Sequence, residues 1–166
     1  MYIEADVKII LIRVITLFLT FSTALIIVLG PGYCIEFTKN SIHGMYCDNY
    51  YASRWNFKMI SPYLHTIVIL FGFNSALVNA LGIYNESIIK RNQNLITIYF
   101  CIAIYCFCGL TEILIYFNIP KTFFYSSSNE NLNVKVYGYL GAGIIYIFAA
   151  ILAVLDFFIY RNDYIF

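Results

Sequence analysis

Charged side chains are scarce in this sequence. Only 11% of the residues are Asp, Glu, Lys or Arg, and 61% are apolar, whereas about a quarter of a soluble domain is charged. This deficit excludes an ordinary soluble domain and indicates a membrane protein. No run of basic residues is longer than Lys90-Arg91, so the electrostatic footprint of nucleic-acid binding is missing and we expect no nucleic-acid partner.

Residues suited to catalysis or metal binding are also sparse. His43 and His65 are the two histidines of the chain, and no H-E-x-x-H segment occurs, which leaves too few ligands for a metal site. No C-x-x-C, G-x-S-x-G or glycine-rich phosphate loop is present. Cys106 and Cys108 are two residues apart, a spacing that points side chains away from each other on a helix. We therefore expect no catalytic residue, no cofactor, no metal and no enzymatic activity.

What the sequence has instead is four long apolar segments. They cover residues 9–29, 62–83, 95–117 and 138–160. Each is long enough, at ~1.5 Å per residue, for a helix to cross the ~30 Å hydrocarbon core of a bilayer. The short connection over 84–94 predicts an antiparallel hairpin. The expected fold class is an all-α membrane protein, an up-down antiparallel four-helix transmembrane bundle that forms a single integral membrane domain over residues 1–166.

Small residues recur at four-residue steps in the second and fourth segments. Such a ridge lets two helix backbones approach closely, which drives helix association in lipid. The predicted helix-packing residues are Gly72, Ala76, Ala80, Gly138, Ala142, Ala149 and Ala153. Gly141 and Gly143 are expected to reinforce the ridge of the fourth segment. We expect most of these positions to be used in packing the bundle itself.

Four ionisable side chains lie inside the apolar segments. Each costs about 2.5–3.5 kcal/mol near a helix centre and therefore requires a partner or a wet cavity. In an up-down order, Arg13 and Asp156 fall at one depth near one face of the bilayer, and His65 and Glu112 fall at one depth near the other. Two intramembrane polar pairs are expected. For Arg13 and Asp156, the alternative to a salt bridge is that each extends separately to the headgroups.

The His65 and Glu112 pair has two interpretations. It is either a buried hydrogen bond that fixes which helices are neighbours, or part of a proton relay or a site for a coupling ion. A relay requires polar groups that connect Glu112 to Asp156. The sequence offers Asn74 and Asn79 for part of this gap.

A polar stripe runs along the first segment. Arg13, Thr16, Thr20 and Thr23 recur at steps of three and four residues, so they share one helix face. We expect this face to be turned toward neighbouring helices.

The five cysteines divide by place. Cys34 and Cys47 lie in a predicted loop over residues 33–60, and the other three lie in the third apolar segment. The loop cysteines either pair in a disulfide or remain thiols, and a lumenal or extracellular loop favours the disulfide. A second loop, over residues 121–137, is expected on the same side of the membrane.

Basic residues decide the expected orientation. Lys and Arg number five on each side of the membrane. The N-terminal tail, the 84–94 connection and the C-terminal tail are much shorter than the other two connections, however, and the positive-inside bias is strongest in short segments near helix ends. Both termini are therefore expected in the cytoplasm, with the cysteine loop in the oxidising compartment.

The fourth segment, AGIIYIFAAILAVLDFFIYR, points to a family. It is a segment rich in small residues that ends in an acidic residue, Asp156, followed by the aromatic Tyr160 and the basic Arg161, and the first segment carries Arg13 in its first turns. This outline resembles the MARVEL-type tetraspan proteins, which include physins, occludin and MAL-like proteins. The first and fourth segments carry the resemblance, and Glu112 is not part of the family pattern.

The resemblance implies a non-enzymatic tetraspan protein that organises membrane apposition, vesicle traffic or cell junctions through lateral helix association. Its partners would be the lipid bilayer and other membrane proteins or further copies of the chain, in the plasma membrane or in secretory or vesicular membranes. The alternative is a small transporter or channel, or an accessory subunit of a larger membrane complex, that uses the intramembrane Glu112 and His65.

Overall fold

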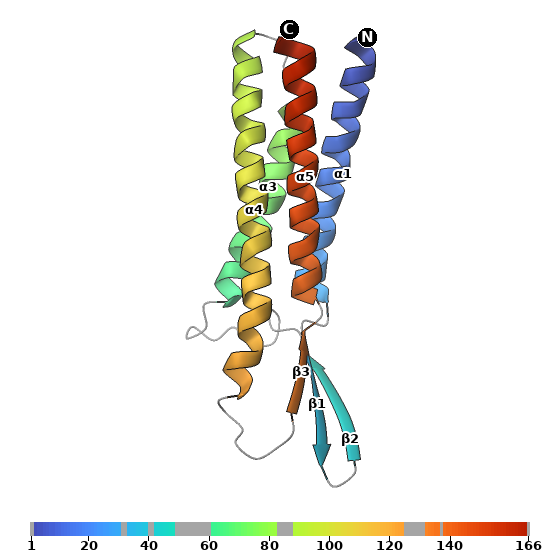
Figure 1. Cartoon of the computed structure of the whole chain (residues 1–166), viewed down its shortest axis with the longest axis vertical. Coiled ribbons are helices and arrows are strands. Elements are labelled where there is room, and N and C mark those ends of the chain that lie inside the picture. Colours follow the sequence, from blue (N-terminus) through green and yellow to red (C-terminus); the bar gives the residue numbers. More distant parts are fainter. Residues whose placement is uncertain are drawn as a thin grey trace.

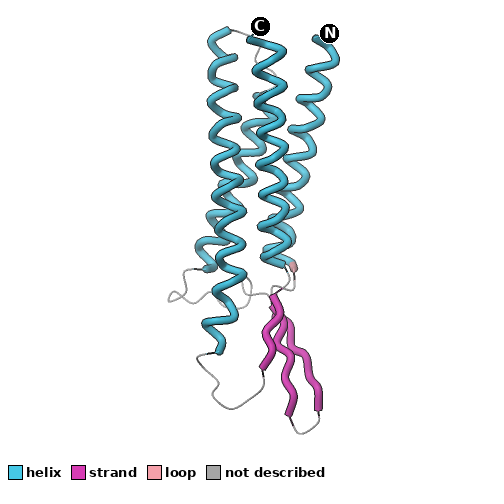
Figure 2. The backbone as a smooth tube through the Cα atoms, in the orientation of Figure 1, coloured by secondary structure: helices cyan, strands magenta, loops and turns pink. Residues whose placement is uncertain are grey.

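In the part of the chain that the structure describes, four helices run side by side and three strands lie at one end of them (Figures 1 and 2). The computed structural model describes residues 2–30, 33–39, 42–48, 61–82, 88–124, 132–136 and 138–165. The helices are α1 (Tyr2–Leu29), α3 (Ser61–Leu81), α4 (Ile88–Phe124) and α5 (Gly138–Ile165). The strands are β1 (Tyr33–Lys39), β2 (Ile42–Asp48) and β3 (Leu132–Val136). The predicted four-helix bundle is confirmed.

Each helix contains a segment that is long and apolar enough to cross a membrane. These segments are Val7–Leu29, Tyr63–Leu81, Asn92–Phe117 and Gly138–Asn162, with mean hydropathy from 1.6 to 2.5. Because hydrocarbon offers no hydrogen bonds, every backbone N–H and C=O in it must be satisfied within the protein, and a helix does this inside one segment. The chain is an integral membrane protein, and its described residues contain four spans.

The four helices form a ring in which consecutive helices are neighbours. α1 packs against α3 and α5, α4 also packs against α3 and α5, and the interface between α4 and α5 is the most extensive. It follows that α1 faces α4 across the bundle and α3 faces α5. Both chain termini lie at the end of the bundle opposite the strands (Figure 1).

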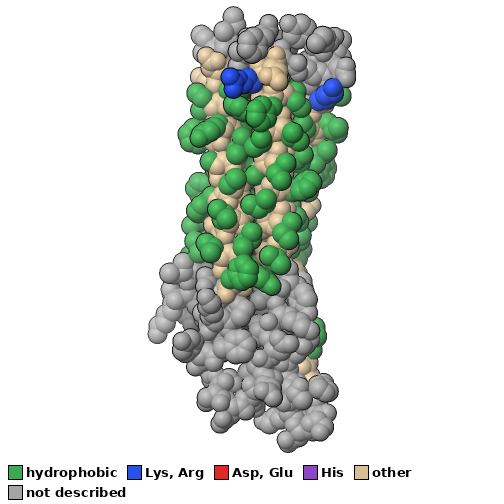
Figure 3. Space-filling model, in the orientation of Figure 1, with side chains coloured by type: hydrophobic (Ala, Val, Ile, Leu, Met, Phe, Trp, Pro, Cys, Tyr) green, Lys and Arg blue, Asp and Glu red, His purple; other side chains and the backbone are tan. Residues whose placement is uncertain are grey.

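The bundle face shown in Figure 3 is covered mainly by apolar side chains, and large apolar side chains are exposed on all four helices. Large side chains on this surface include Phe18, Leu70, Phe107 and Phe148, which are 53 to 67% exposed. Lys and Arg side chains are visible at the end that carries the termini. An apolar surface of this extent matches the hydrocarbon of a bilayer and would be unusual on a soluble monomer.

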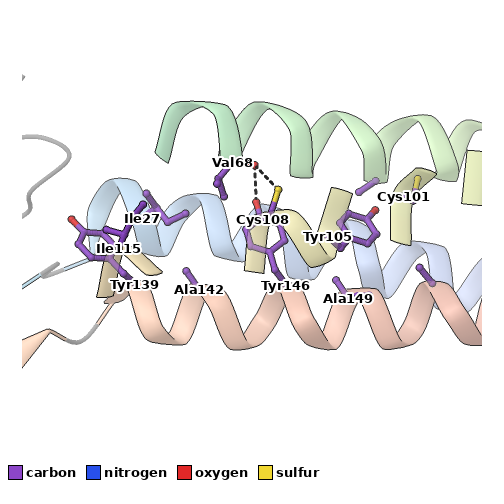
Figure 4. Close-up of a cluster of buried hydrophobic side chains, with 13 residues drawn as sticks. Ile27, Val68, Cys101, Tyr105, Cys108, Ile115, Tyr139, Ala142, Tyr146 and Ala149 are labelled. Atoms are coloured by element: carbon purple, nitrogen blue, oxygen red, sulfur yellow. Dashed lines mark hydrogen bonds between the residues drawn. The ribbon is translucent and has the colours of Figure 1, made fainter. Parts of the chain in front are cut away.

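Tyrosines and small residues fill the centre of the bundle (Figure 4). Tyr146 of α5 reaches across to α3 and donates a hydrogen bond to the backbone oxygen of Val68 at 3.2 Å. Cys108 of α4 donates to the same oxygen at 3.7 Å. Gly72 lies against the Tyr146 ring, and a Cβ at Gly72 would overlap with that ring. Glycine at this position therefore leaves room for the Tyr146 ring, whose hydroxyl group joins α5 to α3.

Most of the predicted packing positions are inside the bundle. Six are buried and Ala80 is half-buried; the buried ones are Gly72, Ala76, Gly138, Ala142, Ala149 and Ala153. Gly141 was expected to reinforce the ridge, but a Cβ there would meet nothing within 4 Å. Gly143 instead packs against Gly109, and a Cβ on either would lie 3.1 Å from the backbone oxygen of the other. This contact brings α4 and α5 together, and Gly109 was not predicted as a packing residue from the sequence.

Two regions that were predicted as loops contain strands. β1 is the central strand and pairs antiparallel with both β2 and β3, in the order β2-β1-β3. The segment LNVKV of β3 alternates apolar and polar residues as a strand does, and β1 and β2 contain aromatic and β-branched residues that favour strands. The sheet thus joins the first connection outside the bundle to the second. Residues 49–60 of the predicted first loop lie outside the described part of the chain.

α4 is longer than predicted. It continues through Asn118-Ile119-Pro120, the expected stop, and ends at Phe124. Proline inside a helix removes one N–H bond and its ring crowds the carbonyl four residues earlier; α4 continues for four residues past Pro120 despite this cost. At its other end α4 begins at Ile88, inside the predicted 84–94 connection, of which residues 84–87 lie outside the described part of the chain.

We expect Gly72→Ala to destabilise the bundle, because the added methyl group overlaps with the buried Tyr146 ring. Overpacking of this kind costs about 1–3 kcal/mol. Gly141→Ala is the matched control, since that position is open and alanine favours a helix. Thermal unfolding in detergent micelles should show a lower melting temperature for Gly72→Ala alone. An equal decrease in both variants would contradict the assigned contact.

Candidate functional site: two intramembrane polar clusters

Arg13 and Asp156 meet inside the bundle, toward the end that carries the termini. Arg13 of α1 donates from Nε to Oδ2 of Asp156 on α5 at 2.9 Å, and the two side chains are 2% and 0% exposed. Neither side chain extends to the headgroups. Of the two interpretations offered by the sequence, the geometry is that of the salt bridge.

Asn79 of α3 binds both members of this ion pair. Its Nδ2 donates to Asp156 Oδ2 at 3.2 Å, and its backbone oxygen accepts a hydrogen bond from Arg13 Nη1 at 3.0 Å. Charge-assisted hydrogen bonds are stronger than neutral ones, and more so where water is absent. Three helices are therefore joined at one depth.

α4 enters the same cluster through Asn94. The Nδ2 group of Asn94 donates to the Tyr160 hydroxyl at 3.3 Å and to the backbone oxygen of Gly82 at 3.1 Å. The guanidinium carbon of Arg13 lies 5.7 Å from the centre of the Tyr160 ring, which is a cation–π contact. We call Arg13, Asn79, Asn94, Asp156 and Tyr160 the terminal-end cluster. It contains side chains from all four helices.

His65 and Glu112 form a second buried contact, which we call the sheet-end pair. His65 Nδ1 of α3 lies 2.8 Å from Glu112 Oε1 of α4, and both side chains are 0% exposed. This distance is that of a hydrogen bond, in which either the imidazole or the carboxyl group is the donor. The Tyr139 ring of α5 packs on the imidazole with a centroid distance of 4.4 Å. The sheet-end pair thus joins α3, α4 and α5.

Some buried atoms of these sites have no hydrogen-bond partner among the described residues. They are Oε2 of Glu112, Oδ1 of Asp156 and Nη2 of Arg13. An unsatisfied buried polar atom costs about 1–3 kcal/mol. Glu112 Oε2 is therefore the position of the sheet-end pair at which a further donor would bind.

Among the described residues, the hydrogen bonds between the two sites do not make a continuous chain. A Cβ at Gly143 would lie 3.4 Å from the Glu112 Cβ, so Glu112 is level with Gly143. From Gly143 to Asp156, α5 rises by about 20 Å. Within this distance, Tyr146 and Cys108 both donate to the backbone oxygen of Val68. A carbonyl has no proton to pass on, so these hydrogen bonds end there.

Of the two asparagines expected in this gap, only Asn79 faces the interior. Asn79 is 4% exposed, whereas Asn74 is exposed on the outer face of α3. The prediction for Asn74 was wrong because five residues turn a helix by about 140° from one face toward the other.

The threonine stripe of α1 faces the bundle interior, as expected. Thr16, Thr20 and Thr23 are buried. Each hydroxyl donates to a backbone oxygen three or four residues earlier in the same helix, at 2.8 to 3.0 Å. These hydroxyls are therefore satisfied within α1 and leave the interhelical hydrogen bonds of this face to Arg13.

Cys34 and Cys47 lie opposite each other on β1 and β2 and are joined by a disulfide. The cysteines of α4 are free, and Cys101 and Cys108 among them are buried. Within the described part of the chain, no group of three or more His, Cys, Asp or Glu is arranged to hold a metal ion.

Two residues of these clusters, Asn94 and Tyr139, were not identified from the sequence. Asn94 lies at the edge of an apolar segment, where polar residues are common, and Tyr139 has the appearance of an ordinary apolar residue of a span. Asn94 could have been identified from its predicted depth, which is the same as that of Arg13 and Asp156.

Comparison of the chain with protein-family models, with curated proteins and with solved structures found no match.

We expect Asp156→Leu to lower the free energy of unfolding by about 3–5 kcal/mol, because it leaves the Arg13 charge buried without its carboxylate. The double variant Arg13→Met with Asp156→Leu removes both charges and should recover most of this loss, since apolar replacements of a buried pair are often neutral. Unfolding in mixed micelles with increasing sodium dodecyl sulfate measures both. Losses that simply add in the double variant would show that the two side chains do not interact.

Proposed function

We propose that this chain is a non-enzymatic tetraspan membrane protein that organises membrane apposition, vesicle traffic or cell junctions through lateral association of its helices. One observation carries the proposal. Arg13 pairs with Asp156 and His65 with Glu112 inside the bundle, while large apolar side chains are exposed on the outer sides of all four helices and cover the face shown in Figure 3. The described helices therefore offer a partner an extensive apolar surface that faces lipid.

The residues behind the resemblance to MARVEL-type proteins support the family proposal. Asp156 binds Arg13, and Tyr160 lies against the Arg13 guanidinium. The arginine of the first span and the acidic and aromatic end of the fourth span thus act as one unit. These contacts offer a physical reason for the residues that carry the resemblance: they join the first and last spans of the bundle.

We further propose that both termini lie in the cytoplasm, in the plasma membrane or in secretory or vesicular membranes. Lys8 and Arg161 are exposed and lie near the chain termini, which are at one end of the bundle (Figure 1), and basic residues near helix ends favour the cytoplasmic side. The Cys34–Cys47 disulfide lies at the opposite end, which suits an oxidising compartment.

The proposal is tested by imaging the chain in its own cells, fused to either of two fluorescent proteins. We expect enrichment at membrane contact sites or on vesicles, together with energy transfer between the two fusions above the level caused by crowding. A tetraspan protein of equal expression with no lateral partners is the control. An even distribution with energy transfer at the control level would contradict the proposal.

The second candidate is a small transporter or channel, or an accessory subunit of a larger complex. It is favoured by the unsatisfied Oε2 of Glu112 beside His65. The packed tyrosines between this site and Asp156, and the hydrogen bonds that end on the Val68 oxygen, argue against a continuous path. An accessory subunit would co-purify with a partner in fixed stoichiometry after mild detergent extraction.

Glu112→Gln separates these candidates. Glutamine can donate a hydrogen bond to His65 Nδ1 but cannot take up or release a proton. If the pair is structural, Glu112→Gln should keep the location and self-association of the protein, while Glu112→Leu should lose about 1–3 kcal/mol of stability. Proton flux into reconstituted vesicles provides the measurement. A flux in the natural protein that disappears in the folded Glu112→Gln variant would replace the proposal with the transporter.

A further inference from the structure

The outer face of α3 carries a carboxamide in the middle of the membrane. The apolar segment of α3 is Tyr63–Leu81, so Asn74 lies within about 3 Å of its midpoint along the helix axis. Its side chain is exposed on the surface of the bundle. The side chains around it on this face are apolar and exposed; they are Ile67, Leu70, Phe71, Leu77 and Val78.

Asn74 makes no hydrogen bond with any residue in the described part of the chain. Its neighbour Ser75 donates to the backbone oxygen of Phe71 at 2.6 Å, and the exposed Ser22 of α1 donates to that of Phe18 at 2.8 Å. These hydroxyls are satisfied by their own helix. Away from the ends of the spans, Asn74 is the one carboxamide or charged side chain that the described structure exposes.

An exposed carboxamide at this depth is costly in lipid. Hydrocarbon offers it neither a donor nor an acceptor, and a buried polar group without partners costs several kcal/mol in an apolar medium. The headgroups begin about 12 Å away along the helix, which is far beyond the reach of an asparagine side chain. A hydrogen-bonding group from another helix in the same bilayer would satisfy it, and asparagine is known to join transmembrane helices in this way.

We propose that the outer face of α3 is the interface of a homodimer, in which Asn74 of one copy hydrogen-bonds to Asn74 of a second copy. Copies inserted in the same direction are related by a two-fold axis along the membrane normal, which places equivalent residues at the same depth. A carboxamide carries both a donor and an acceptor, so two of them are complementary to each other. The proposal rests on the proposed lateral association and gives it a surface and a partner.

Self-association in vesicles of a phosphatidylcholine bilayer tests this interface. Donor- and acceptor-labelled copies of the full chain are reconstituted over a range of protein-to-lipid ratios, and energy transfer gives the dissociation constant of the dimer. Asn74→Leu should raise this constant by about tenfold. Asn74→Gln keeps a carboxamide and should stay close to the natural protein.

Two control variants keep the test specific. Ser75→Ala changes the next residue of the same helix, and Phe148→Leu changes the outer face of α5; neither should alter the dimer. Because Asn74 faces outward, Asn74→Leu should melt at the same temperature as the natural protein when both are diluted to monomers in detergent micelles, so a lost dimer cannot be attributed to misfolding.

The failures of the two proposals are distinguishable. If the natural chain dimerises and Asn74→Leu dimerises equally well, the α3 interface is overturned and lateral association stands. If the natural chain is monomeric in vesicles but its enrichment at contact sites in cells requires Asn74, the partner is a different protein and the homodimer is overturned. If the chain is monomeric and evenly distributed in cells, both proposals fail.

Discussion

Hydrocarbon offers no hydrogen bonds, and this constraint explains how the helices of this protein are arranged. A charged side chain inside a span must find its partner on another span. Arg13 and Asp156 do so at 2.9 Å, and Asn79 binds both of them. Because breaking a buried ion pair is far more costly than never forming it, the pair penalises any arrangement that separates α1 from α5. The sheet-end pair does the same for α3 and α4.

Close packing makes these short contacts reachable. Asparagine and aspartate have short side chains, so the helices that carry them must approach closely. Gly109 and Gly143 bring the backbones of α4 and α5 together, and Gly72 makes room for the Tyr146 ring between α3 and α5. Small residues and polar pairs therefore act together: the former set how near the helices lie, and the latter set which helices are neighbours. Away from the ends of the spans, Asn74 is the one carboxamide or charged side chain that the described residues expose on this largely apolar surface.

Much of this architecture could be predicted from the sequence, because the position of a residue along a membrane-spanning helix determines its depth in the bilayer. Hydropathy gave the four spans, and counting from their ends placed His65 and Glu112 at one depth. The sheet was missed because β1 and β3 are far apart in the chain, and their pairing depends on contacts that no local pattern reveals. Asn74 was misplaced because depth alone does not determine the face of a helix.

The ion pair between the first and last spans is the central claim, and solid-state nuclear magnetic resonance in bilayers tests it most directly. Labelling the Arg13 side chain with nitrogen-15 and the Asp156 carboxyl carbon with carbon-13 allows the dipolar coupling between them to be measured. A coupling that corresponds to direct contact, as the 2.9 Å separation of Nε and Oδ2 requires, is the predicted result. The absence of a coupling in the folded protein would mean that these side chains do not meet, and it would contradict the account.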